Sequence, residues 1–161
     1  MVEQQISVEN KMTLNKKRWV NKKPRIIEIE EHGSHTMGFL TPVTENKQIP
    51  FSIKRVFWTN GGTKDTVRGN HAHKETEEVI VAVSGTIEIE VVLDDMNRKV
   101  YILDNPCQGL YLPPNAWRTL YFNKNAVCLT MASTEYDPND YENDMVNWLQ
   151  RDYSDEKFFN E

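Results

Sequence analysis

The chain has 161 residues, a formal net charge of −5 and 27% charged residues. Its length suits a single domain with its own hydrophobic core. The acidic balance argues against nucleic acid as a partner, because neutralising a phosphate backbone requires a basic face. No hydrophobic run approaches the roughly 20 residues of a membrane span, so we expect no membrane partner.

The two cysteines, Cys107 and Cys128, show no CxxC spacing and are expected to be free thiols in a reducing compartment. The polar N-terminus also lacks the apolar core of a signal peptide. These features predict a cytoplasmic protein.

Residues 1–24 are polar and favour a flexible or partner-docked arm. From residue 25 to 136, short β-prone runs alternate with turn residues. The clearest runs are 25–30, 51–58, 78–83, 86–93, 99–103, 109–112, 117–122 and 126–132. The run that ends at Ser84-Gly85 and the alternating run before Asp94-Asp95 indicate a hairpin in this region. Eight to ten short strands without helices between them predict an all-β domain, a jelly-roll barrel or sandwich.

The last segment, residues 137–161, has a different pattern. Asp137 offers an N-cap, Pro138 suits the first helical position and Asp140 places an acid in the first turn. Apolar residues then follow at helical spacing: Tyr141, Met145, Trp148 and Leu149. We therefore expect one C-terminal helix that packs on the barrel or on a partner subunit.

His71 and His73 lead into this β region. On an extended strand, residues i and i+2 point to the same face, so both imidazoles should share one wall. If that wall lines the inside of a barrel, the pair faces a pocket where groups that titrate near neutrality can take and return protons. The other histidines, His32 and His35, are expected to be structural or solvated.

The spacing from His71 through His73 and Glu78 to Gly85 resembles the first signature of the cupin superfamily, which are small β-barrels. Metal-binding cupins use the two histidines and the glutamate as ligands. The second cupin signature would supply a third histidine where Arg118 stands. A guanidinium has no lone pair for a metal, and its charge disfavours a nearby dication. We therefore expect a cupin barrel without the standard metal site.

Four segments, in order over most of residues 26–145, are similar to the nucleotide-sugar 3,4-ketoisomerases. They are 49–57, 68–74, 109–114 with Trp117, and 132–133 with Tyr136, Asp137, Asp140 and Tyr141. The most diagnostic segment reads Arg-Gly-Asn-His-Ala-His-Lys. The resemblance implies a metal-independent cupin enzyme that needs no cofactor and is usually a homodimer. It also implies a nucleotide-sugar substrate, a dTDP-4-keto-6-deoxyhexose that is converted to its 3-keto isomer. Glu78 departs from the family, which more commonly carries Gln at this position.

That reaction removes a proton from C3, passes through an enediolate and delivers a proton to C4. By resemblance His71 and His73 carry these transfers, and the spacing leaves open which of them abstracts the proton. Arg118 could stabilise the enediolate or hold a diphosphate oxygen.

Arg55 shares strand parity with Phe51, Ile53 and Phe57, and a charge on such an apolar face usually has a partner or a ligand. Diphosphate binding by Arg55 or Arg68 competes here with a structural ion pair. Arg68 has the opposite parity to His71 unless Gly69 introduces a bulge. Three aromatic residues are candidates to flank the sugar or the base, with core packing as the alternative: Tyr111, Trp117 and Tyr121.

Three other functions stay open at this point. A 3,5-epimerase acting on the same class of sugar also removes protons next to the C4 ketone, although it typically pairs one His with an Asp. A noncatalytic sugar-nucleotide binding module would use the same pocket without chemistry. A metal-dependent cupin oxygenase would use His71, His73 and Glu78 as ligands.

Overall fold

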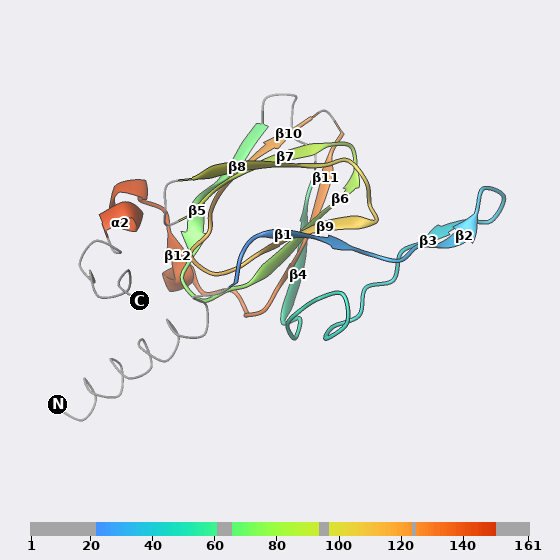
Figure 1. Cartoon of the computed structure of the whole chain (residues 1–161), viewed down its shortest axis with the longest axis horizontal. Helices are drawn as coiled ribbons and strands as arrows, with labels where there is room; N and C mark the ends of the chain where they lie inside the picture. The colour runs from blue at the N-terminus through green and yellow to red at the C-terminus, as the bar shows by residue number, and fades with distance from the viewer. Residues whose placement is uncertain (1–21, 61–65, 94–96, 124, 151–161) are drawn as a thin grey trace.

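The computed structural model describes residues 22–60, 66–93, 97–123 and 125–150. The predicted arm therefore lies outside the described residues except for 22–24, and so does the tail after residue 150. Two antiparallel sheets face each other in this structure, and a short hairpin extends from one end (Figure 1). This arrangement confirms the predicted all-β cupin barrel with one C-terminal helix.

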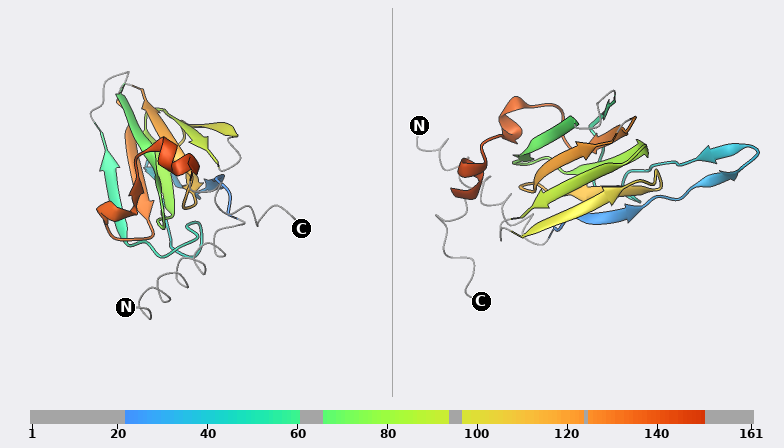
Figure 2. Two further views of the ribbon diagram at one scale, coloured as in Figure 1. Left: turned by 90° about the vertical axis from the view of Figure 1, so that its left-hand side faces the viewer. Right: turned by 90° about the horizontal axis from the view of Figure 1, so that it is seen from above.

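Each of the two large sheets has five strands. The first sheet has the order β1 (Arg25–Glu28), β9 (Gln108–Leu112), β6 (Glu78–Ser84), β11 (Val127–Ala132) and β4 (Arg55–Thr59). The second has the order β12 (Tyr141–Glu142), β5 (Thr66–His73), β10 (Trp117–Phe122), β7 (Ile87–Val92) and β8 (Arg98–Leu103). The hairpin consists of β2 (His32–Ser34) and β3 (Gly38–Leu40) and projects away from the barrel (Figure 2). His32 and His35 lie exposed on it, as expected for solvated histidines.

The barrel interior is filled by apolar side chains from both sheets. Ile80 and Leu110 come from the first sheet, and Ile89 and Leu120 come from the second. Two further clusters lie outside the barrel. One packs Ile29, Ile49 and Phe51 onto the outer face of the first sheet, and the other packs Trp148 against Trp117 on the second. Both faces of each sheet are therefore partly buried. For this reason a buried side chain on a strand does not necessarily point into the barrel.

We expected the runs 78–83 and 86–93 to pair as a hairpin, but the hairpin consists of the second of these runs and the strand that follows it. β7 pairs with β8, whereas β6 pairs with β9 and β11 in the other sheet. The turn at Ser84-Gly85 thus carries the chain from one sheet to the other. The expected strand at 51–58 begins only at Arg55, because Phe51 and Ile53 join the cluster outside the first sheet.

The C-terminal helix begins later than predicted. Asp137 does cap a helix, but that helix is the single 3-10 turn η1 (Pro138–Asp140). Tyr141 and Glu142 then pair with β5 as a short strand, which prevents the helix from continuing. The α-helix α2 (Met145–Gln150) follows, and the Asp144 carboxylate accepts hydrogen bonds from the backbone N–H groups of Val146 and Asn147. No helix in the described part of the chain is long and apolar enough to cross a membrane.

A bulge in β5 sets which of its side chains point inward. Arg118 pairs with His71 and Thr119 pairs with Gly69, so Asn70 is an extra residue. Gly69 and Asn70 both have positive φ, 84° and 52°. The bulge changes the parity before His71 and places Arg68 on the same face as His71, opposite Leu120.

This bulge yields a matched stability test. A Cβ at Gly69 would lie 2.6 Å from the Arg118 carbonyl oxygen, whereas one at Gly38, with φ of +81°, would meet nothing within 4 Å. Both Gly→Ala changes incur left-handed strain, but only Gly69→Ala adds a clash, which typically costs about 1–3 kcal/mol more. Urea unfolding should therefore show a larger loss of stability for Gly69→Ala than for Gly38→Ala. Equal losses would contradict the close approach.

Candidate active site

His71 and His73 lie side by side on the inner face of β5, as predicted. Their ring centroids are 5.1 Å apart, with one ring edge-on to the other. His71 is half-buried, and its Nδ1 donates a hydrogen bond to the Gly69 carbonyl oxygen at 2.9 Å. A carbonyl oxygen can only accept, so in neutral His71 the free lone pair is on Nε2.

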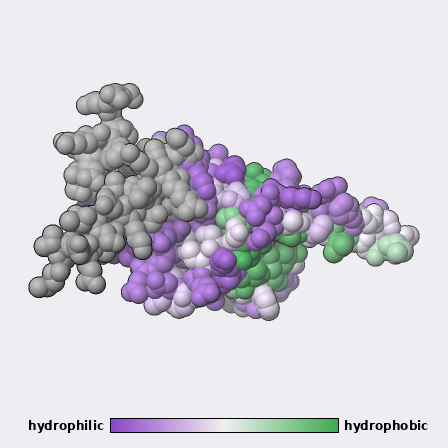
Figure 3. Space-filling view, turned by 90° about the horizontal axis from the view of Figure 1, so that it is seen from below, coloured by the Kyte–Doolittle hydropathy of each residue, from purple (hydrophilic) through white to green (hydrophobic). Residues whose placement is uncertain are grey.

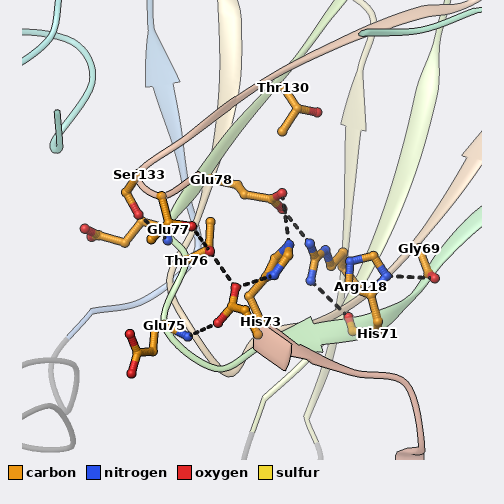
Figure 4. A network of polar contacts seen from close by, with 12 residues as sticks. Gly69, His71, His73, Glu75, Thr76, Glu77, Glu78, Arg118, Thr130 and Ser133 are labelled. Atoms are coloured by element: carbon orange, nitrogen blue, oxygen red, sulfur yellow. Dashed lines mark hydrogen bonds and ion pairs between the residues drawn. The ribbon is translucent and has the colours of Figure 1, made fainter. Parts of the chain in front are cut away.

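Glu78 reaches across from the first sheet to this pair (Figure 4). Its Oε2 accepts from Arg118 at 2.6 Å, and its Oε1 is 3.2 Å from His73 Nε2. The side chains of Glu78, His73 and Arg118 are each no more than 4% exposed. Arg118 also donates to the backbone oxygen of His71 at 3.2 Å. The two sheets are thus joined at the site by a buried ion pair.

Asp140 approaches His73 from the other side. Its Oδ2 lies 2.8 Å from His73 Nδ1 and 2.5 Å from the Thr76 hydroxyl. Its Oδ1 accepts from the backbone N–H of Glu75 at 2.7 Å. The η1 turn presents Asp140 at this point because Tyr141, the next residue, pairs with His73 in the sheet.

These contacts lower the pKa values of Glu78 and His71. Burial alone would raise the pKa of Glu78, but the Arg118 guanidinium and the hydrogen bond from His73 outweigh it and lower that pKa to about 2. Burial, with the positive charges of Arg118 and His73, lowers the pKa of His71 to about 4. At neutral pH the site therefore holds an ionised Glu78 and an uncharged His71.

Tyr141 borders the histidine pair, Tyr136 lies against Tyr141, and Arg55 lies against Tyr136. The Tyr141 ring lies 4.9 Å from the His71 ring and 4.5 Å from the His73 ring, measured between centroids. The Arg55 guanidinium carbon is 5.6 Å from the centre of the Tyr136 ring. Among the described residues, Arg55 Nε is a buried side-chain nitrogen without a hydrogen-bond partner. A buried donor of this kind is suited to a ligand that can accept a hydrogen bond.

The structure brings together some of the predicted site residues and not others. His71, His73 and Arg118 meet directly, while Arg55 and Arg68 lie on inward faces of β4 and β5. The three predicted aromatic residues point the other way and do not line the site. Tyr111 is fully buried in the cluster outside the first sheet and donates to Glu77.

Trp117 and Tyr121 belong to the outward face of β10, opposite to that of Arg118. Trp117 packs on Trp148, and Tyr121 is 40% exposed. Tyr111 and Trp117 thus lie in packed clusters, which was the alternative left open for them, and contact of the three aromatic side chains with the substrate stays a prediction. Aromatic character and β propensity indicated a strand but not its inner face.

Sequence reasoning assigned no catalytic or binding role to Asp140, Tyr141 or Tyr136. All three lie in segments that carry the family resemblance, which was the available signal. Their proximity to the histidines depends on the η1 turn and on β12, which the helical spacing obscured. Within the described ranges, no group of three His, Cys, Asp or Glu side chains is arranged to hold a metal ion.

The Glu78–Arg118 pair should contribute strongly to stability. Replacing Arg118 by Met leaves Glu78 buried without its main partner, and breaking a buried pair in this way typically costs about 3–5 kcal/mol. The control is Arg98→Met, which removes an exposed pair to Glu90 and should cost at most about 1 kcal/mol. Urea unfolding at pH 7 measures both variants. A loss for Arg118→Met as small as that for Arg98→Met would contradict the assignment.

Comparison with known proteins identifies the family. Residues 22–152 match the FdtA family model, described as WxcM-like, C-terminal. A TDP-4-oxo-6-deoxy-alpha-D-glucose-3,4-oxoisomerase from Aneurinibacillus thermoaerophilus is 42% identical over 106 residues, which cover 65% of this chain and 75% of the relative.

Two solved structures of 3,4-ketoisomerases are also similar to this chain. QdtA, a sugar 3,4-ketoisomerase from Thermoanaerobacterium thermosaccharolyticum solved in complex with TDP, is 29% identical with a TM-score of 0.78, over 84% of this chain and 98% of that one. A 3,4-ketoisomerase from Helicobacter canadensis is 33% identical with a TM-score of 0.76, over 81% and 98%.

An epimerase is more distant. The 3'-monoepimerase ChmJ from Streptomyces bikiniensis is 16% identical with a TM-score of 0.65, over 74% of this chain and 68% of that one, and so shares the fold alone. The match over residues 22–152, together with the 42% identical relative, shows that this chain belongs to the FdtA, WxcM-like family.

Proposed function

We propose that this protein moves the keto group of a dTDP-4-keto-6-deoxyhexose from C4 to C3. The observation that carries the proposal is the neutral His71, whose free Nε2 belongs to an imidazole packed edge-on against His73. An uncharged imidazole can accept a proton from carbon, which a protonated one cannot. The relative from Aneurinibacillus thermoaerophilus is named for this conversion.

In this mechanism His71 takes the proton from C3 of the sugar. The electrons of the broken C3–H bond form an enediolate across C3 and C4. The protonated His71, whose proton exchanges with solvent, then delivers a proton to C4, and the proton of the C3 hydroxyl is transferred to the C4 oxygen, which becomes a hydroxyl. The substrate and the product are isomers, so no electron leaves the sugar. Arg118 places positive charge beside the position where the enediolate develops.

Arg55 and Arg68 are proposed to hold the diphosphate. Arg55 has the buried Nε without a partner, and its guanidinium lies near two aromatic rings, those of Phe57 and Tyr136. Arg68 is exposed on the inward face of β5, on the same side as His71. A planar guanidinium suits phosphate oxygens because it can donate two parallel hydrogen bonds. Arg118 is already engaged with Glu78 and is assigned to the reaction centre instead.

We also propose a homodimer in the cytoplasm. The projecting hairpin exposes apolar side chains, with Met37 88%, Phe39 51% and Leu40 66% exposed. A two-stranded hairpin is marginally stable alone in water, so contact with a second subunit would stabilise it. Figure 3 shows hydrophobic side chains gathered on the barrel beside the base of this hairpin. The cytoplasmic location is supported by the two free cysteines, Cys107 and Cys128.

Solvent exchange tests the reaction directly. Incubation with dTDP-4-keto-6-deoxyglucose in heavy water should place deuterium at C4 of a 3-keto product and at C3 of recovered substrate. Replacing His71 by Asn should lower turnover at least about 100-fold, because general-base catalysis contributes on that order. The control is His35→Asn on the exposed hairpin, which should keep full turnover. Nuclear magnetic resonance of the sugar measures both label positions.

The alternatives give different labels. Deuterium at C3 and C5 of a sugar that is still a 4-ketone would indicate an epimerase. Tight binding without any label would indicate a noncatalytic module. Activity lost to a chelator, with about one metal ion bound per chain, would indicate the oxygenase.

Diphosphate binding by Arg55 is tested with TDP alone. Arg55→Met should weaken TDP binding at least about tenfold, because a hydrogen bond to a charged group contributes about 1.5–3 kcal/mol. The neighbouring Lys54 is exposed, and Lys54→Met serves as the control for charge alone. Isothermal titration calorimetry gives both dissociation constants. Equal values for the two variants would assign Arg55 to a structural role.

A further inference from the structure

We propose that Asp140 is a positioning residue that, together with Glu78, holds His73 as a doubly protonated imidazolium. His73 then contributes a fixed positive charge to the reaction and His71 is the group that moves protons. The catalytic part of this inference rests on the proposed isomerase function. The charge state of His73 rests on the contacts of its two ring nitrogens.

Both ring nitrogens of His73 face carboxylate oxygens. Nδ1 is 2.8 Å from Asp140 Oδ2, and Nε2 is 3.2 Å from Glu78 Oε1. An ionised carboxylate only accepts hydrogen bonds, so both nitrogens must donate. A neutral imidazole carries one proton and would turn a lone pair toward one of the two carboxylates. The ring is 3% exposed, so water does not replace the missing donor.

The hydrogen bonds around Asp140 have a defined direction. The Thr76 hydroxyl gives its single proton to Asp140 Oδ2, so the Thr134 hydroxyl, 2.5 Å from it, must donate to Thr76. The backbone N–H of Glu75 donates to the other carboxylate oxygen. Burial would raise the pKa of Asp140, but the hydrogen bonds from His73, from the Thr76 hydroxyl and from the Glu75 N–H lower it. Asp140 is therefore ionised and oriented toward His73.

The buried charges balance only if His73 is positive. Glu78 and Asp140 bring two negative charges, and Arg118 brings one positive charge to Glu78. An imidazolium supplies the second positive charge and lies between the two carboxylates. A neutral His73 would leave Asp140 without a cationic partner at a site where its side chain is 10% exposed.

This arrangement distinguishes the two histidines. Both N–H groups of His73 are engaged, so it has no proton acceptor site and no free donor to offer the sugar. His71 keeps a free Nε2 and lies against the imidazolium. Besides burial and Arg118, the positive charge of His73 lowers the pKa of His71, and it would stabilise an anionic enediolate.

The first test is spectroscopic and does not need substrate. In protein labelled with nitrogen-15 in its histidines, both ring nitrogens of His73 should be protonated at pH 7. Asp140→Asn should leave one of them without a proton. Asp137→Asn is the matched control, because Asp137 caps the same η1 turn without touching His73. A wild-type His73 with one bare nitrogen would overturn the proposal.

The second test separates positioning from binding. Asp140→Asn should lower kcat by roughly 10–100-fold and leave KM and the dissociation constant of TDP within about threefold, because only the environment of the reaction changes. Asp137→Asn should retain the wild-type kcat. An unchanged kcat in Asp140→Asn, or equal losses in both variants, would contradict the assignment.

A second pair of variants guards against a folding defect at Asp140. Thr76→Val removes the donor that orients Asp140 and should lower kcat in the same direction, whereas Thr76→Ser keeps the hydroxyl and should restore it. Equal kcat values for Val and Ser would count against the proposal. If the wild-type protein did not isomerise the sugar at all, the proposed function would fail, while the nitrogen-15 spectrum would still decide the charge of His73.

Discussion

The structure of the site depends on one buried interaction, the ion pair between Glu78 of the first sheet and Arg118 of the second. It joins the two sheets where the inward face of the barrel changes from apolar to polar. Removing two charges from water is costly unless each is fully paired, and here Glu78 also meets His73 while Arg118 also donates to the His71 backbone. Arg118 stands at the sequence position where the second cupin signature would supply a third histidine ligand. This one residue therefore contributes both to the stability of the site and to its electrostatics.

The surroundings of His71 and His73 give these two imidazoles different hydrogen-bond partners and different charges. His71 has a carbonyl on one nitrogen and a free lone pair on the other, and burial together with the neighbouring positive charges keeps it neutral. His73 lies two residues further along the strand and is enclosed by carboxylates on both sides. A pKa of about 4 makes His71 a weak base. The positive charges that weaken it also favour the anionic intermediate, so the loss in basicity is offset where the enediolate forms.

Much of this site follows from strand periodicity. The spacing of His71 and His73 predicted a shared wall, and the resemblance to the first cupin signature implied that Glu78 lies near them. The sequence did not indicate which sheet face Tyr111, Trp117 and Tyr121 occupy, because both faces of their sheets are covered and an aromatic side chain suits either face. For Arg68 the sequence left two faces open, depending on a bulge at Gly69, and the structure has that bulge and places Arg68 inward. Asp140 was read as part of a helix because an N-cap followed by proline begins a 3-10 turn as readily as an α-helix. Its contact with His73 joins residues 67 positions apart, which local patterns do not report.

The central claim is that the protein environment keeps His71 neutral beside a charged neighbour. A nuclear magnetic resonance titration of the His71 ring in the wild-type protein measures this most directly. Because burial and positive neighbours both disfavour its protonated form, the account predicts that His71 stays neutral at pH 7 and titrates with a pKa near 4. A pKa at or above the ordinary value of about 6.5 would contradict it.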